Sequence, residues 1–137
     1  MGNLERSGSG LLLAAVLAGC AASGGQSCPA GLAPMTSAEL TFGLSIPGGG
    51  MVSETDWQRF VDAEITPRFP DGLTITDAKG QWKDRSGIVR EPSKRLLVVV
   101  TGKPADATKL EAIRAAYRAR FHQESVLLVE TPVCGSF

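Results

Sequence analysis

The residues best suited to bind a ligand are concentrated between residues 66 and 91. Arg68 lies within a proline-flanked stretch, Trp82 ends an expected strand, and Arg90 and Glu91 follow after an expected hairpin turn. A guanidinium group binds carboxylates well, and an indole ring can form a wall of a small pocket. One interpretation is a ligand pocket formed by Arg68, Trp82, Arg90 and Glu91. The alternative is structural: prolines fix a turn, the aromatic rings pack, and Arg68 pairs with an acid such as Glu91.

Other residues give weaker indications of chemistry. His122 is the only histidine, and we expect it at the end of a helix, where a protonated imidazole favours the helix dipole; the alternative role is that of a general base. Glycines 48–50 lie between an expected strand and an expected helix, where a phosphate can bind, but Glu54 and Asp56 would repel an anion. We interpret these glycines as a turn. No catalytic residue, metal site or cofactor is predicted.

The first of the three cysteines is explained by the residues before it. Residues 11–18 are apolar but too few to span a hydrocarbon core of roughly 30 Å, and they are typical of a signal peptide. The sequence LAGC at residues 17–20 resembles the lipobox of bacterial lipoproteins. This resemblance implies lipidation of Cys20 and a lipid anchor in the bacterial cell envelope, facing the periplasm. The alternatives are an ordinary signal peptide and a buried apolar segment.

The chain is predicted to have three parts. Residues 1–19 are a lipoprotein-type signal peptide, residues 20–38 a flexible tether rich in small residues, and residues 39–137 a single domain. A length of 137 residues leaves room for one compact domain. Lys plus Arg and Asp plus Glu both number 14, so no excess of charge indicates a nucleic acid or an anionic membrane surface as partner.

Hydrophobic periodicity predicts the order strand, helix, strand, strand, helix, strand. Ser53 is the expected N-cap of the first helix, with Val52 and Trp57 positioned as a hydrophobic staple. Pro67 ends this helix near Thr66, because the residue before a proline avoids helical geometry. The expected ranges are 39–46, 53–66, 71–82, 93–101, 105–122 and 124–131, with a hairpin tip or loop at 83–87.

This order predicts an α+β fold of the ferredoxin-like split βαβ type, with βαββαβ topology. Right-handed crossovers place both helices on one face of a four-stranded antiparallel sheet with strand order 4-1-3-2. Because the last strand pairs with the first, Cys28 before the first strand is expected near Cys134 after the last. An exported compartment would allow these two to form a disulfide. The alternative is two free cysteines in mobile ends.

The face of the sheet away from the helices is predicted to be a binding surface. Residues 96–100 are apolar on both faces of their strand, and residues 126–129 offer apolar side chains in both directions. Since the helices cover only one face, we expect a second subunit, preferably in a homodimer, or an apolar ligand on the other. The alternative is that the tether or the hairpin arm folds over part of this face.

Three stretches of the sequence resemble one protein family. ELTFGLS, GGGMVSETDWQRFVDAEITPRFPDGLTITDAKGQW and YRARFHQESVLLVETPVCGSF together resemble the bacterial family called domain of unknown function 3574. The resemblance covers residues 35–137 and implies a small, often lipid-anchored protein with no established activity. It implies no catalytic residue.

The main functional hypothesis is a membrane-tethered, non-enzymatic envelope lipoprotein that binds a partner or a second copy through its open sheet face. The alternative is a small-molecule-binding domain or enzyme resembling the dimeric α/β-barrel monooxygenases, with a pocket near Arg68, Trp82 and Glu91. A third hypothesis, a module like protease inhibitors or propeptides, rests on fold analogy alone. No nucleic-acid partner is expected.

Overall fold

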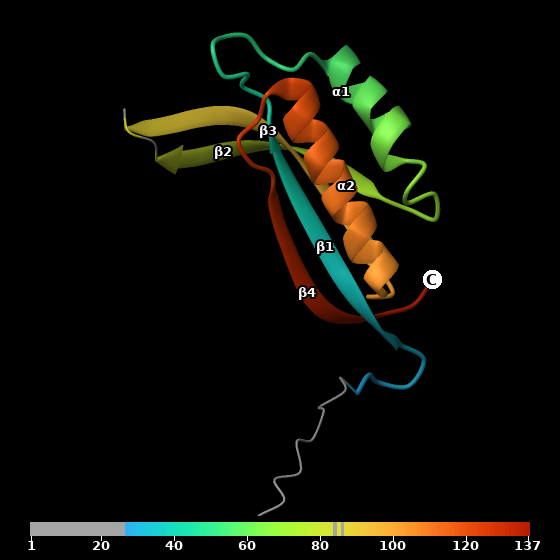
Figure 1. Cartoon of the computed structure of the whole chain (residues 1–137). Helices are drawn as coiled ribbons and strands as arrows, with labels where there is room; N and C mark the ends of the chain where they lie inside the picture. Colours follow the sequence, from blue (N-terminus) through green and yellow to red (C-terminus); the bar gives the residue numbers. More distant parts are fainter. Residues whose placement is uncertain (1–26, 84, 86) are drawn as a thin grey trace, which may run out of the picture.

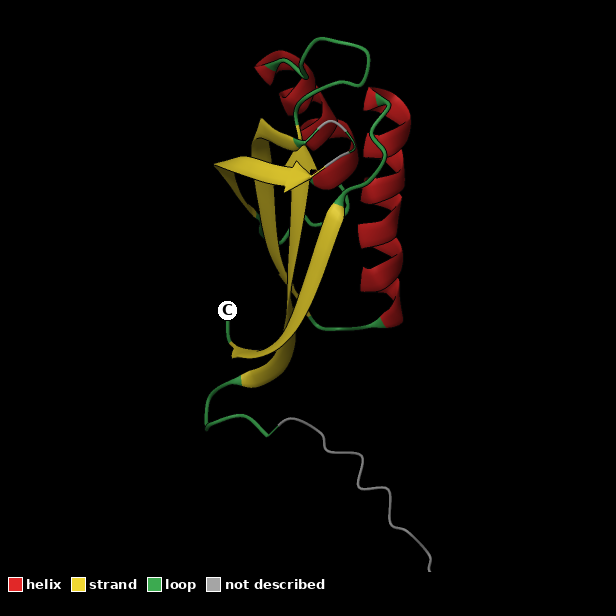
Figure 2. Ribbon diagram, turned by 90° about the vertical axis from the view of Figure 1, so that its left-hand side faces the viewer, coloured by secondary structure: helices red, strands yellow, loops and turns green. Residues whose placement is uncertain are grey.

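The computed structural model describes residues 27–83, 85 and 87–137, which form a sheet covered by helices on one face. Figure 1 shows the helices in front of the sheet, and the side view in Figure 2 separates the two layers. In the described part of the chain, no helix has both the length and the apolar character needed to cross a membrane. The elements are β1 (Ala33–Gly43), α1 (Glu54–Phe60), its π-helical continuation η1 (Val61–Ile65), β2 (Thr74–Lys83), β3 (Ile88–Val100), α2 (Pro104–Phe121) and β4 (Leu127–Gly135).

The sheet is four-stranded and antiparallel, with the order β2-β3-β1-β4. This order confirms the predicted ferredoxin-like topology. β1 is central and pairs with β3 and β4, while β2 and β4 are the edge strands. The β2–β3 hairpin extends beyond the helices as an arm, at the end of the molecule opposite the start of β1 (Figure 1).

The first helix begins as the sequence predicts. The Ser53 side chain accepts a hydrogen bond from the backbone N–H of Asp56 at 3.1 Å, which satisfies one of the free donors at the helix start. Val52 and Trp57 are both buried, as the hydrophobic staple requires. The last turns of this helix are π-helical, with the Thr66 N–H donating to the Val61 carbonyl at 2.9 Å.

An aromatic cluster fills the space between the sheet and the helices. Phe42 of β1 lies 5.2 Å from Trp57, 6.2 Å from Phe60 and 4.8 Å from Tyr117, measured between ring centroids. Phe42, Phe60 and Tyr117 are fully buried. Edge-to-face contacts of this kind add stabilisation beyond the apolar area that is buried. The predicted stripe of α2 faces this core, with Leu110, Ile113, Tyr117 and Phe121 all buried.

β1 and β4 extend further than the sequence predicts at the ends that pair with each other, whereas β1 ends at Gly43 instead of residue 46, and β2 and β4 each begin three residues later than expected. β1 begins at Ala33 rather than at residue 39, and its first residues pair with β4, for example Pro34 with Cys134. β4 runs past Pro132 to Gly135, which an edge strand permits because a proline there removes no interior hydrogen bond. Small side chains and prolines hide the strand pattern at these ends, so composition alone indicates loops.

β3 is one continuous strand although it contains Pro92. The Pro92 carbonyl accepts a hydrogen bond from the Leu44 N–H at 3.0 Å, so the nitrogen of Pro92 also faces the β1 side of the strand. Proline has no N–H to donate to a neighbouring strand. Because β1 ends at Gly43, opposite Ser93, the missing N–H of Pro92 falls just beyond the β1–β3 ladder and weakens it little. The expected break between the arm and the strand at residues 93–101 is therefore absent.

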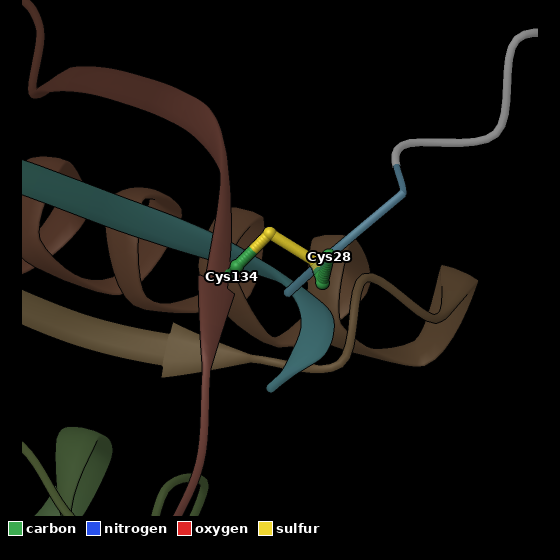
Figure 3. Close-up of a disulfide and its surroundings, with 2 residues drawn as sticks. All are labelled: Cys28 and Cys134. Atoms are coloured by element: carbon green, nitrogen blue, oxygen red, sulfur yellow. A yellow bond between two sulfur atoms is a disulfide. The ribbon is translucent and has the colours of Figure 1, made fainter. Parts of the chain in front are cut away.

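A disulfide joins the two ends of the domain. Cys28 and Cys134 are bonded, with their Cα atoms 5.6 Å apart and 106 positions between them in sequence (Figure 3). The bond lies where β4 runs alongside the beginning of β1, as the strand order predicts. Cys20, the expected lipidation site, and the expected signal peptide at residues 1–19 lie outside the described residues.

Candidate functional site

Trp82 and Glu91 are in direct contact on the β2–β3 arm. Trp82 pairs with Val89 and Glu91 pairs with Gly80, which makes Trp82 and Glu91 diagonal neighbours on one face of the sheet. The indole Nε1–H of Trp82 donates to Oε1 of Glu91 at 3.0 Å. The backbone N–H of Ser45 donates to Oε2 at 3.2 Å. Two uncharged donors from distant parts of the sequence therefore fix the position of the carboxylate.

Residues without bulky side chains form the surface beneath this carboxylate. A Cβ atom at Gly43 would lie only 2.6 Å from Oε1 of Glu91, and one at Gly80 only 2.8 Å from Oγ of Ser93. The carboxylate can lie flat on the sheet because Gly43 has no side chain. Phe42, the preceding residue, points into the core beneath the helices. By strand alternation, Glu91 thus lies on the open face of the sheet.

The negative charge of Glu91 is not neutralised by any described Lys or Arg. The salt bridges among the described residues involve other acids, and Glu91 itself is only partly exposed. On the other face, the Tyr117 hydroxyl donates to the Gly43 carbonyl at 2.8 Å. Burial, together with the nearby charge of Glu91, raises the pKa of Tyr117 well above its ordinary value. The arm therefore carries a carboxylate that two hydrogen bonds hold in place.

Arg90 lies on the opposite side of the arm from Glu91. Consecutive residues of a strand point to opposite faces, so the Arg90 side chain belongs to the helix side. A hollow of about 530 Å³ lies on the arm where Arg90 is found. It is lined by Asp77, Ala78, Lys79, Gly80, Gln81, Arg90, Glu91 and Pro92.

Arg68 lies after η1 and pairs with Glu64. One guanidinium nitrogen of Arg68 donates to the Glu64 carboxylate at 2.9 Å and to the Glu64 carbonyl at 2.6 Å. Sequence reasoning suggested Glu91 as the paired acid, but the partner lies only four residues away, as is common in helices. Phe69 is buried, whereas Trp82 remains 47% exposed. Of the four expected pocket residues, Glu91 contacts Trp82 directly and shares the lining of the hollow with Arg90, whereas Arg68 is paired with Glu64 instead.

Lys94 is a buried charged residue that sequence reasoning did not single out. Its Nζ atom lies 2.6 Å from Oδ1 of Asp77 and 2.7 Å from Oε2 of Glu54, while the residue is only 6% exposed. Hydrogen bonds to Asp77 and then to Glu54 raise the pKa of Lys94 and keep it charged. These contacts join β3 to β2 and to the first turn of α1, which is a structural role.

His122 and glycines 48–50, also considered for chemistry, have structural roles in a helix end and a turn. His122 is the exposed C-cap of α2, in a left-handed conformation with φ of 53°, and so the predicted helix end is confirmed. Glycines 48–50 all have positive φ, and the Gly49 N–H donates to the Ile46 carbonyl at 3.0 Å, as expected for a turn. No group of three or more potential metal ligands occurs within the described ranges.

The open face also carries exposed apolar side chains. Leu97 is 38% exposed, Leu127 59% and Val129 48%. In the register of the sheet, Glu39 lies between Leu97 and Val129, and it forms an ion pair with Arg95 on the same face. We call Leu97, Leu127, Val129, Glu39 and Arg95 the open-face patch. Their exposure shows that no described segment folds over this patch.

Comparison with known proteins supports the family and the fold. The model of a family described as "Protein of unknown function (DUF3574)" matches residues 37–137, the region in which the sequence resemblance was found. No curated protein sequence matches the chain.

Solved structures with this fold include enzymes and other proteins. A phage SAM lyase in complex with S-methyl-5'-thioadenosine is 19% identical, with a TM-score of 0.57 over 75% of this chain and 90% of the lyase. The apo form of a phage SAM lyase is 20% identical, with a TM-score of 0.52 over 74% and 84% of the two chains. CutA1 from Oryza sativa is 10% identical, with a TM-score of 0.51 over 77% and 85%. At these identities the likeness shows a shared fold.

Proposed function

Because the chain belongs to the DUF3574 family, whose description assigns no function, we propose a function from its own residues. The protein is a membrane-tethered, non-enzymatic binding domain of the bacterial cell envelope that acts through its open sheet face. The observation that carries this proposal is the open-face patch, in which three apolar side chains are exposed beside an ion pair. Apolar patches on a sheet face that no helix covers are typical of interaction surfaces.

The proposed tether depends on Cys20. We expect the mature protein from bacterial membranes to begin at Cys20 and to carry a diacylglyceryl group and an N-acyl chain, because LAGC resembles a lipobox, whose cysteine takes the lipid. Mass spectrometry of the N-terminal peptide measures this directly. A Cys20→Ala variant should lack the added lipid mass. An unmodified wild-type peptide that spans Cys20 would contradict the anchor.

We propose a second copy of the chain as the occupant of the open-face patch. A two-fold interface brings identical residues of two copies together, so the patch must complement itself. It holds one acid, Glu39, and one base, Arg95, which allows the Glu39 of each copy to meet the Arg95 of the other. The interface would then bury the apolar side chains around this pair, and each Å² of apolar surface removed from water stabilises the dimer by about 25 cal/mol.

Leu127→Asp should prevent this self-association. We expect residues 27–137, which contain the described sheet, the described helices and the disulfide, to form a dimer. The variant should dissociate at least about 100-fold more readily, because the dimer would bury the unpaired charge of the introduced aspartate. Size-exclusion chromatography with light scattering over a range of concentrations gives the dimer dissociation constants of the wild type and of the variant. Ile88→Asp is the matched control, since Ile88 is 52% exposed but lies on the arm, away from the patch. A wild-type monomer at every concentration, or an unaffected Leu127→Asp dimer, would contradict the proposal.

A further inference from the structure

Trp82 and Glu91 form a site that the proposed self-association does not use. We propose that they bind a small organic cation, specifically a quaternary or alkylated ammonium group. This proposal goes beyond the envelope-binding function and does not depend on it. It rests on a carboxylate fixed in place, on an exposed indole bonded to it, and on the observation that no described Lys or Arg lies within salt-bridge distance (4.0 Å) of this carboxylate.

The Glu91 carboxylate can still accept further hydrogen bonds and pair with a positive charge. A carboxylate offers about four lone-pair positions, and the N–H groups of Trp82 and Ser45 use one on each oxygen of Glu91. Both donors are uncharged, so they fix the group without cancelling its charge. An anion would meet the carboxylate rather than these donors, which are already engaged. The charge of the site therefore selects a cation.

The composition of the site favours an organic cation over a metal ion. Calcium needs six to eight oxygen ligands and magnesium a near-ideal octahedron, whereas this site supplies one carboxylate. Trp82 instead supplies an aromatic ring that is 47% exposed. Tryptophan is the best side chain for attracting alkylated ammonium groups, through its ring quadrupole and its apolar surface. Because the indole N–H and Oε1 of Glu91 are hydrogen-bonded at 3.0 Å, an alkylated ammonium group is large enough to contact the carboxylate and the face of the ring at the same time.

The position of Gly43 shows that the site is already formed. The Glu91 carboxylate occupies the space that a Cβ at Gly43 would fill, so the ligand does not have to order this side chain. Fixing the binding groups in advance lowers the entropic cost of binding. No positive φ constrains Gly43, so an alanine there would move the flexible carboxylate while the backbone stays as it is.

The test is a titration of residues 27–137 with choline, followed by the indole N–H signals in ¹⁵N–¹H NMR spectra. The chain has two tryptophans, and Trp57 is buried with 2% exposure, so its signal serves as an internal reference. We expect the Trp82 signal to shift in a saturable way while the Trp57 signal stays fixed. The uncharged isostere 3,3-dimethyl-1-butanol, titrated at the same ionic strength, should cause no saturable shift.

Two variants separate binding from a purely structural role of Glu91. Glu91→Gln keeps an acceptor for Trp82 but removes the charge, and Gly43→Ala keeps the charge but displaces the carboxylate. Each should weaken choline binding by about tenfold, while Glu124→Gln, which removes an exposed glutamate outside both this site and the open-face patch, should not. The melting temperatures of the variants show whether each is folded.

The outcomes decide the proposal. A Trp82 signal that does not respond to choline, or that responds equally to the isostere, overturns it. Choline binding that is unchanged in Glu91→Gln also overturns it. Repeating the titration with the Leu127→Asp variant keeps the result separate from self-association, because a monomer that still binds choline supports the cation site even where the proposed dimer fails.

Discussion

Replacing Cys28 and Cys134 by serine is expected to lower the free energy of unfolding by about 4 to 5 kcal/mol, before any strain in the folded state is counted. The reason is the length of the closed loop, because the two cysteines are 106 positions apart. The bond restricts nearly all of the unfolded domain, so its loss raises the entropy of the unfolded chain. Urea unfolding of residues 27–137 in the oxidised wild type and in the double variant measures the difference.

Reduction of the wild type provides the matched control for this variant. Wild-type protein unfolded in the presence of a reductant should have the same stability as the double serine variant. Both should keep the ferredoxin-like fold, because the core lies between the sheet and the helices and not at the disulfide. If reduction leaves the midpoint of unfolding unchanged, Cys28 and Cys134 are not joined in solution.

Phe42→Ala is expected to cost about 3 to 5 kcal/mol of stability. Phe42 is fully buried, and its ring contacts Trp57, Phe60 and Tyr117. Removing it leaves a cavity at the point where β1, α1 and α2 meet, and three partner rings lose an aromatic contact. Chemical denaturation at constant pH gives the change in free energy.

Phe137→Ala is the control of identical chemistry. Phe137 is 93% exposed, so its removal should change the stability by less than about 0.5 kcal/mol. If the two variants lose comparable amounts of free energy of unfolding, Phe42 does not pack in the core as described.

The sequence predicted the fold because its elements carry strong periodic signals. The buried stripe of α2 and the Ser53 cap of α1 both agree with their local patterns. The strand ends were harder to predict, because Pro92 and Pro132 normally interrupt strands. Each is tolerated for a reason that depends on neighbouring strands: Pro92 lies where β1 ends, and Pro132 lies on an edge. Such reasons become visible only when the pairing is known.

The candidate site was predicted in part. Trp82 and Glu91 were named from their position across a hairpin, and they are indeed bonded. The contribution of Ser45 could not be foreseen, because it lies 46 positions from Glu91 and reaches it through a backbone N–H that no side-chain pattern reports. The pairing of Arg68 with Glu64 did have a signal, namely their spacing of four residues. Of the two interpretations of Arg68, a ligand group or the partner of an acid, the structure supports the second, with Glu64 in place of Glu91 as the acid.

With a lipid on Cys20, as proposed, the disulfide would limit how far the domain can lie from the membrane. If Cys20 carries the lipid, only eight positions separate it from Cys28. A chain of this length spans at most about 28 Å between the lipid-bearing residue and the disulfide. β1 begins near this bond, and its 11 residues span about 37 Å before the chain reaches Gly43. The β2–β3 arm, which carries Trp82 and Glu91, lies at the end of the molecule opposite the start of β1 (Figure 1). With such an anchor, ligands dissolved in the periplasm, rather than lipid headgroups, would reach the Trp82–Glu91 site first.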